Sequence, residues 1–242
     1  IRPDLVVFDA AGRASNLKHC KQLGIKTVYI GQNTKKRNRA LGWRRLRHTD
    51  EIWMVQAPFA LPSLSPIEKF KLKLKGENSL KYLGPIFPAI SEEKQNAVLK
   101  KYGLKRQDFV LVNAGSGGHH VNGLCAADVF FDAATYIAQH HTTINIFGAN
   151  YSGATAEPQK KANLQVARHI PTEDFSCLLQ CARLVIISGG SSLLQTIARG
   201  VPTIAISISS DQNERIRACA AHNLTRECEL DAKTMTSMAI NF

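Results

Sequence analysis

The sequence has no apolar run that approaches the roughly 20 residues a membrane-spanning helix needs. It also shows no cationic segment followed by an apolar one, so no secretory signal is recognised. Aromatic residues make up only 7% of the chain, and no nucleic-acid recognition motif is present. These absences disfavour an integral membrane protein and a basic nucleic-acid-binding protein, although the charge described below would permit the latter.

Paired cysteine motifs are also missing. The six cysteines are Cys20, Cys125, Cys177, Cys181, Cys219 and Cys228. None belongs to a C-x-x-C pair, and Cys177 and Cys181 have no neighbouring histidine that would complete a zinc site. We therefore expect buried free thiols in a reducing cytosol, with no metal site and no cofactor.

The net charge of +12 is concentrated in the first third of the chain. Residues 1–88 hold 17 Lys/Arg against 6 Asp/Glu, a net +11, whereas the remainder holds 14 against 13, a net +1. A broad contact with an anionic surface is thus expected in the first third. The basic cluster within residues 33–48 (Lys35, Lys36, Arg37, Arg39, Arg44, Arg45, Arg47) indicates a peripheral contact with an anionic membrane.

The first third also has the pattern of a parallel α/β unit. Apolar, β-branched runs predict strands over 4–9, 26–30 and 51–55, and a helix is expected over about 14–23. Because a helix separates the first two strands, they should run parallel. The alternation of lysines and hydrophobes over 69–75 predicts an edge strand or loop with a solvated lysine face, rather than a membrane or nucleic-acid element.

Gly84-Pro85 is the expected domain boundary, giving domains 1–84 and 85–242. The second domain alternates strands and helices again. Its expected strands are 109–113, 143–147, 164–166, 184–187 and 203–208, and its expected helices are 91–103, 122–139, 172–181, 191–199 and, last, 212–222. This order predicts a doubly wound parallel sheet.

Two glycine-rich loops follow strands of this second domain. They are Gly115-Ser116-Gly117-Gly118 and Gly189-Gly190-Ser191-Ser192. Glycines let backbone N–H groups approach an anion, and a following helix N-terminus adds unpaired N–H groups, so either loop can seat a phosphate or simply serve a tight turn. The sequence contains no P-loop, no G-x-G-x-x-G, no G-x-S-x-G and no H-E-x-x-H motif.

The spacing around the second loop is more specific. Gly189-Gly190 is followed by Ser192, Gln195, the turn Gly200-Val201-Pro202 and finally Asp211-Gln212. This set resembles the donor-binding signature of nucleotide-sugar glycosyltransferases of the GT-B fold. The resemblance is strongest to the family of the N-acetylglucosaminyltransferase that makes lipid II, and it covers the second half of the chain. It implies an α/β, GT-B-like fold of two Rossmann-like doubly wound parallel-sheet domains, the first of them incomplete.

The resemblance also implies roles for individual residues. It places the diphosphate at the second glycine loop, the base at the backbone near Ile170, the ribose at Gln195 and the sugar hydroxyls at Asp211 and Gln212. The family usually has Glu where Gln195 stands, which leaves the preferred nucleotide open. A base for catalysis is expected from a glycine-rich loop that would precede Ile1, so no catalytic residue is assigned.

Other polar residues near these loops are expected to have minor roles. His119 and His120 are interpreted as a loop contact or a solvated pair rather than a base. Glu214, Arg215 and Arg217 are expected to be surface charges, and Arg199 a cation at a helix end.

We therefore predict a cytoplasmic glycosyltransferase of the hexosyltransferase type, peripheral at the inner face of the membrane. It would move a sugar from a nucleoside-diphosphate donor, a UDP-sugar, to a lipid-linked or cell-envelope glycan acceptor, without a metal. The alternatives are a nucleotide-sugar hydrolase or epimerase of the same fold and a basic nucleic-acid-binding protein. The sequence does not define the donor sugar, the acceptor or the oligomeric state.

Overall fold

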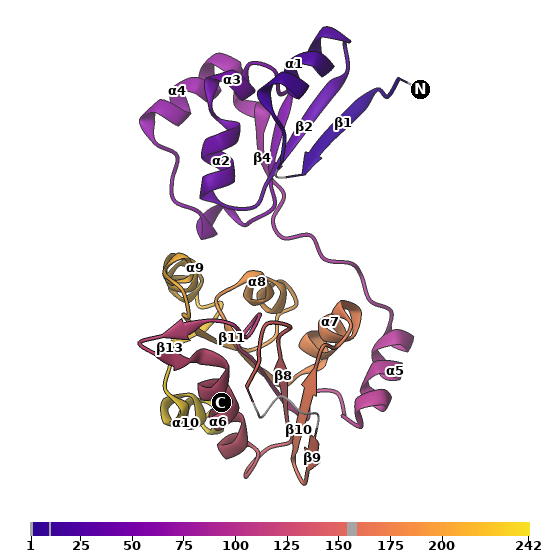
Figure 1. Ribbon diagram of the computed structural model, residues 1–242, viewed down its shortest axis with the longest axis vertical. Coiled ribbons are helices and arrows are strands. Elements are labelled where there is room, and N and C mark those ends of the chain that lie inside the picture. The colour runs from indigo at the N-terminus through magenta and orange to yellow at the C-terminus, as the bar shows by residue number, and fades with distance from the viewer. Residues whose placement is uncertain (1, 10, 154–158) are drawn as a thin grey trace. The chain divides into compact units, whose positions relative to one another are not determined.

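The computed structural model describes residues 2–9, 11–153 and 159–242. The chain divides into two compact units, Ile1–Ile86 and Phe87–Phe242 (Figure 1). Both are built on parallel sheets, which confirms the predicted α/β class. Among the described residues, no helix is both long enough and apolar enough to cross a bilayer.

Unit 1 is a four-stranded parallel sheet in the order β1-β2-β3-β4. Its strands are β1 (Leu5–Asp9), β2 (Lys26–Gly31), β3 (Glu51–Met54) and β4 (Leu80–Tyr82). Its helices are α1 (Ala14–Gln22), α2 (Thr34–Ala40), α3 (Trp43–Leu46) and α4 (Pro66–Lys75), with short 3₁₀ turns at Pro58–Ala60 and Glu77–Ser79. Tyr29, Ile52 and Met54 form the centre of its core with Leu41 and Leu46.

The edge strand or loop predicted over residues 69–75 is wrong, because this segment belongs to helix α4. Ser65 accepts a hydrogen bond from the backbone N–H of Glu68, and the Glu68 carboxylate accepts one from the N–H of Ser65. Pro66 occupies the first turn, where its missing N–H costs nothing. These capping interactions stabilise the start of the helix. The alternation of lysines and hydrophobes over only seven residues is too short to favour a strand against them.

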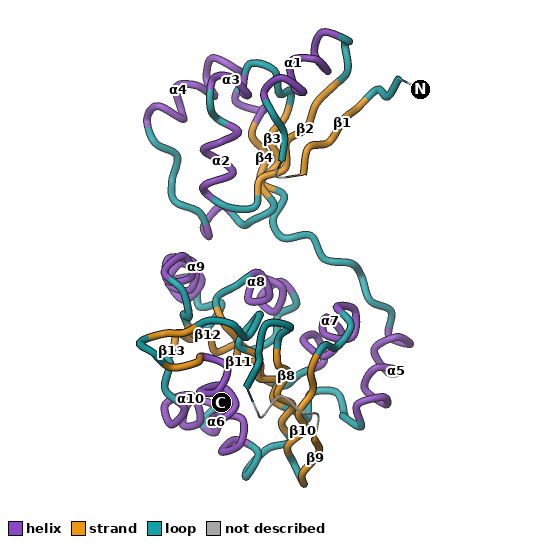
Figure 2. The backbone as a smooth tube through the Cα atoms, in the orientation of Figure 1, coloured by secondary structure: helices purple, strands orange, loops and turns teal. Residues whose placement is uncertain are grey.

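Unit 2 contains a seven-stranded sheet in the order β13-β12-β11-β5-β8-β10-β9, in which only the edge strand β9 is antiparallel (Figure 2). Its strands are β5 (Val110–Asn113), β8 (Thr143–Phe147), β9 (Gln159–Lys161), β10 (Leu164–Arg168), β11 (Leu184–Ser188), β12 (Thr203–Ile206) and β13 (Arg226–Cys228). A small hairpin pairs β6 (His120–Val121) with β7 (Leu124–Cys125). Its helices are α5 (Glu92–Tyr102), α6 (Ala126–Ile137), α7 (Thr172–Cys181), α8 (Ser191–Ala198), α9 (Ser210–Ala221) and α10 (Ala232–Ile240).

Helices cover both faces of the unit 2 sheet because the side chains of its central strands alternate in direction. Val110 and Val112 pack with residues of α6 and α10. Leu111, between them, packs with residues of α5 and α7 on the opposite face. The sheet is therefore doubly wound, as the sequence predicted.

Two predicted element limits in unit 2 are wrong. The helix predicted over 122–139 starts only at Ala126, because Asn122 and Gly123 both have positive φ (50° and 82°) and close the β6–β7 hairpin. The helix expected over 212–222 is α9, but it is not the last element, since β13 and α10 follow it.

All six cysteines are free. Cys177, Cys181, Cys219 and Cys228 are buried, whereas Cys20 and Cys125 are half-buried. Burial raises the pKa of each of the four buried thiols, for Cys228 to about 11.

We expect this difference to appear in alkylation kinetics. A raised pKa lowers the thiolate fraction at pH 8, and burial blocks the reagent, so the four buried cysteines should react only after unfolding. Mass spectrometry of the folded protein treated with iodoacetamide should find the label first on Cys20 and Cys125. Equal labelling of all six in the folded state, at the rate seen in denaturant, would contradict the packing described.

Candidate functional site

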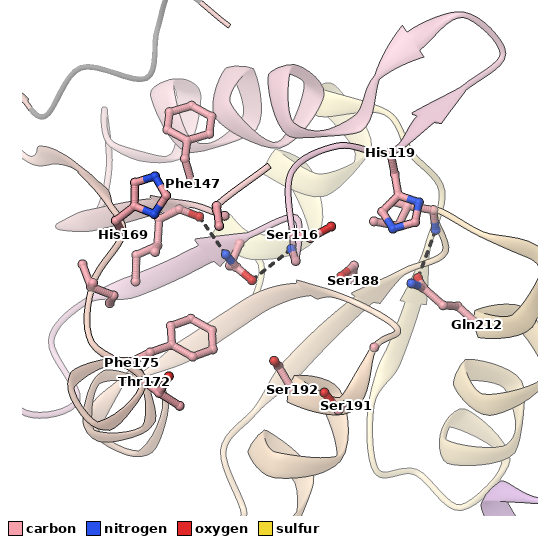
Figure 3. Close-up of a pocket in the computed structure, with 18 residues that line it drawn as sticks. Ser116, His119, Phe147, His169, Thr172, Phe175, Ser188, Ser191, Ser192 and Gln212 are labelled. Carbon is pink, nitrogen blue, oxygen red and sulfur yellow. Dashed lines mark hydrogen bonds between the residues drawn. The ribbon is translucent and has the colours of Figure 1, made fainter. Parts of the chain in front are cut away.

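A cavity of about 500 Å³ opens at the carboxyl edge of the unit 2 sheet (Figure 3). In open parallel sheets this edge is where ligands bind. Seven of the twelve substrate-binding residues expected from the sequence line it: Gly115, Ser116, Ile170, Gly190, Ser191, Ser192 and Gln212. The other five, Gly117, Gly118, Gly189, Gln195 and Asp211, are not part of its lining.

The first glycine loop is held against β8 by the buried side chain of Asn113. Its Nδ2 donates to the carbonyl of Ile146 at 2.7 Å, and its Oδ1 accepts from the N–H of Gly115 at 3.0 Å (Figure 3). At Gly148, which follows β8, an added Cβ would lie only 2.1 Å from the carbonyl oxygen of Gly115. Two strand ends thus meet backbone to backbone, and this contact leaves Ser116 at the cavity wall.

Gly117 has a packing role in this loop. Its φ is +88°, and an added Cβ would lie 2.7 Å from the Cβ of Tyr151. The structure therefore gives a reason for glycine at this position that does not involve a ligand.

The second glycine loop joins β11 to α8, and its two glycines differ. A Cβ on Gly189 would meet the Ile216 side chain at 2.6 Å, whereas a Cβ on Gly190 would meet nothing within 4 Å. Gly190 is the N-cap of α8 and provides no side-chain cap, so the first N–H groups of the helix remain available at the cavity. Ser191 and Ser192 begin the helix and add hydroxyl groups to the same wall (Figure 3).

Helix α9 fixes this second loop from behind. The Gln212 side-chain carbonyl accepts hydrogen bonds from the N–H of Gly189 at 3.0 Å and of Ile208 at 3.2 Å. Arg215 donates through Nη1 to the carbonyl of Gly189. Arg215 is therefore a half-buried contact of the loop, and the expectation that it is a surface charge is wrong.

The remaining predicted contacts face away from the cavity or are occupied within the fold. Asp211 is exposed and accepts from the hydroxyl of Ser209 at 2.7 Å. Gln195 is buried, and its Nε2 donates to the hydroxyl of Ser176 in α7 at 2.7 Å. The ribose contact of Gln195 and the sugar contact of Asp211 stay predictions.

The opposite end of the cavity is more apolar. Phe147, His169 and Phe175 lie there in Figure 3. Ile170, the neighbour of His169 in the chain, also lines the cavity, and His169 has a positive φ of 53°. Phe175 comes from the second turn of α7, and the helical pattern of 172–181 gave no sign that it faces a cavity rather than the core. His169 was not predicted to be a site residue.

Among the described residues that line the cavity, none has an acidic side chain. Its polar groups are hydroxyls, amides, the imidazoles of His119 and His169, and backbone N–H groups at the start of α8. Such a surface can accept an anion without charge repulsion. Within the described ranges, no three His, Cys, Asp or Glu side chains are grouped to hold a metal ion. His120 lies in β6 and is exposed.

Comparison with solved structures finds a similar fold in two glycosyltransferases and an epimerase. The glycosyltransferase of kitacinnamycin matches with a TM-score of 0.63 at 13% identity, covering 99% of this chain and 67% of its own. The spinosyn rhamnosyltransferase SpnG, complexed with thymidine diphosphate, matches with 0.60 at 14%, covering 99% and 65%. The UDP-GlcNAc 2-epimerase of Methanocaldococcus jannaschii matches with 0.60 at 13%, covering 99% and 70%.

The fold is GT-B-like. At these identities the likeness shows the fold alone, and the chain spans about two thirds of the length of these structures. No family model and no curated protein matches the sequence.

Gln212 provides a test of how the second loop is held. Replacing it with Ala leaves the buried N–H of Ile208 without its acceptor and removes one of two acceptors from Gly189. We expect Gln212→Ala to lower the free energy of unfolding by about 2 kcal/mol. The exposed neighbour Asn213 is the matched control, and Asn213→Ala should change it by less than about 0.5 kcal/mol. Urea unfolding measures both, and equal midpoints for the two variants would contradict this account.

Proposed function

We propose that the unit 2 cavity binds a nucleoside-diphosphate sugar and that the protein transfers this sugar to an acceptor. The observation that carries the proposal is the uncapped N-terminus of α8, with Ser191 and Ser192, at one end of a cavity that has no carboxylate in its described lining. A diphosphate would be stabilised there by backbone N–H groups, hydroxyls and the helix dipole.

The two ends of the cavity suit the two ends of such a ligand. The apolar end at Ile170 and Phe175 can pack against the flat face of a base, while the diphosphate reaches α8. Thymidine diphosphate in the SpnG structure and UDP-GlcNAc in the name of the archaeal epimerase both point to a pyrimidine base. We therefore take UDP-sugars as the first donors to test.

In transfer, the acceptor hydroxyl oxygen forms a bond to the anomeric carbon as the bond from that carbon to the diphosphate oxygen breaks, and the hydroxyl proton is released to solvent. Negative charge then grows on the departing diphosphate. Donors fixed at the start of α8 favour that charge without having to reorganise, which is the contribution this unit makes to the rate.

Ligand-induced stabilisation tests the binding step directly. A nucleoside diphosphate at about 100 times its Kd should add roughly 2.7 kcal/mol of stability, a rise in melting temperature of about 5–10 °C for a chain of this size. We expect UDP and thymidine diphosphate to give this rise, and ADP and GDP to give less.

Variants connect the shift to the cavity. Ser192→Ala should reduce the shift, while Asn213→Ala, on the exposed side of α9, should leave it unchanged. If no nucleoside diphosphate raises the melting temperature, or if Ser192→Ala and Asn213→Ala give the same shift as the unchanged protein, the donor site is not where we place it.

A hydrolase or epimerase is the second candidate, because the archaeal epimerase matches with the same TM-score as SpnG. Acceptor dependence separates the two functions. Incubation of the full-length protein with UDP-GlcNAc alone should leave the donor unchanged if the protein is a transferase. Free sugar or a 2-epimer formed without an acceptor would favour the second candidate.

A further inference from the structure

Helix α4 of unit 1 exposes a line of apolar side chains. In this ten-residue helix, Ile67, Phe70 and Leu74 are 67%, 58% and 63% exposed. At about 100° per residue the three lie within roughly 60° of one another around the helix axis. We call these three residues the α4 stripe. Large apolar side chains gathered in this way mark an interaction surface.

The other side of α4 is fixed to unit 1. Leu72, on the side opposite the stripe, is buried in the core of this unit. The carboxylate of Glu68 lies 3.6 Å from Nε of the buried Arg37, so the only acid of the helix is turned to the fold. The stripe is therefore held outward by packing, and α4 needs no ligand to become a helix.

Lysines border the stripe along both sides. The same helical geometry places Lys71 and Lys75 on one side of it and Lys73 on the other, whereas Lys69 lies nearer the side of Leu72. The basic helices α2 and α3 add the exposed cations Lys35, Arg39, Arg44 and Arg47 to this unit.

Trp43 of α3 lies beside Lys71 of α4. Its ring is half exposed (51%), and the Lys71 ammonium lies 5.5 Å from the ring centroid. Tryptophan is enriched at the level of lipid headgroups, where its ring is partly apolar and its N–H is hydrated. This residue thus adds an exposed aromatic ring beside α4 and no negative charge.

Two cations of the 33–48 cluster are used inside the unit. Arg37 is only 2% exposed and donates to the carbonyl of Pro62 at 2.6 Å, and Arg45 donates to the carbonyl of Gly12 at 3.1 Å. The cluster therefore provides fewer free charges than the sequence suggests, and its apolar complement lies outside it, in α4.

We propose that α4 and Trp43 dock unit 1 onto an anionic lipid surface, with the α4 stripe entering the headgroup region and the lysines contacting lipid phosphates. An apolar line with lysines on both sides fits this occupant because lysine stems extend along the apolar layer while their ammonium groups reach the anionic surface. A nucleic acid would use the lysines but leave three large apolar side chains in water. A protein interface is a poorer fit, since such interfaces are depleted in lysine. The docking does not depend on the proposed sugar transfer.

Vesicle flotation of the whole chain tests the proposal. Vesicles of phosphatidylcholine with about 30% phosphatidylglycerol are compared with phosphatidylcholine alone, at low and near-physiological salt. We expect binding to the anionic vesicles, weaker at higher salt and at least about tenfold weaker without the anionic lipid.

Matched variants separate the stripe from the charge. The triple variant Ile67→Ser, Phe70→Ser, Leu74→Ser keeps every charge and should bind at least about tenfold more weakly, because the apolar contribution is lost. Lys71→Gln with Lys73→Gln, the lysines nearest the stripe on its two sides, should lose a similar factor at low salt. The controls are the exposed residues of unit 2: Leu124→Ser with Tyr136→Ser for the stripe, and Lys100→Gln with Lys105→Gln for the charge. Circular dichroism and melting temperature verify that each variant folds.

Trp43 reports insertion without any change in the stripe. In a Trp53→Phe variant, Trp43 is the only tryptophan, and its emission should shift to shorter wavelength when anionic vesicles are added. The proposal is overturned if the unchanged protein does not float with anionic vesicles at low salt, or if the folded stripe variant binds as well as the unchanged protein. It is also overturned if Trp43 emission stays constant on binding, or if RNA is bound at salt concentrations at which these vesicles are not.

Discussion

The site depends on a backbone contact that only glycine permits. Where β8 ends, Gly148 lies against the carbonyl of Gly115, so closely that a Cβ would come within 2.1 Å of that oxygen. Parallel strands bring their carboxyl ends to one edge of the sheet, and this contact lets two of the turns at that edge meet. The same loop after β5 lies against the end of β11, because a Cβ on Gly115 would come within 2.8 Å of the Ser188 hydroxyl oxygen, and both loops line the cavity.

The chemistry of the wall follows from how its groups are held. Gln212 and Arg215 bind the N–H and the carbonyl of Gly189 from behind, so this loop is fixed by α9 before any ligand arrives. The N-terminus of α8 is left uncapped by a side chain and faces the cavity instead. The protein thus keeps hydrogen-bond donors unsatisfied at one place, and an anion with several oxygens is the ligand that satisfies them.

Most of the secondary structure could be predicted from the sequence, but the contacts between residues far apart in the chain could not. The longer strands of both units could be predicted because apolar runs of this length form buried strands, and the fold class followed from their order with helices. The short strands β4, β9 and β13 and the β6–β7 hairpin have no such run and were not predicted. Helix α4 was not predicted because the alternation of lysines and hydrophobes in residues 69–75 is typical of a strand. The signals for a helix, the capping residues Ser65 and Glu68, lie before that segment. The contact of Arg215 with Gly189 could not be predicted. The sequence pattern of an amphipathic helix is the same whether its basic residue is solvated or donates to the carbonyl of a loop that folding brings near. The position of Phe175 at the cavity could not be predicted either, because it also depends on which elements pack together.

Calorimetric titration of UDP and of uridine is the most direct test of a diphosphate site at the start of α8. If the diphosphate provides most of the contacts, UDP should bind at least about tenfold more tightly than uridine, since hydrogen bonds to a charged group contribute roughly 1.5–3 kcal/mol each. Gly190→Val, whose Cβ enters open space beside the α8 N-terminus, should abolish that difference while the fold is retained. Equal affinities for UDP and uridine in the unchanged protein, or no binding of either, would contradict the account.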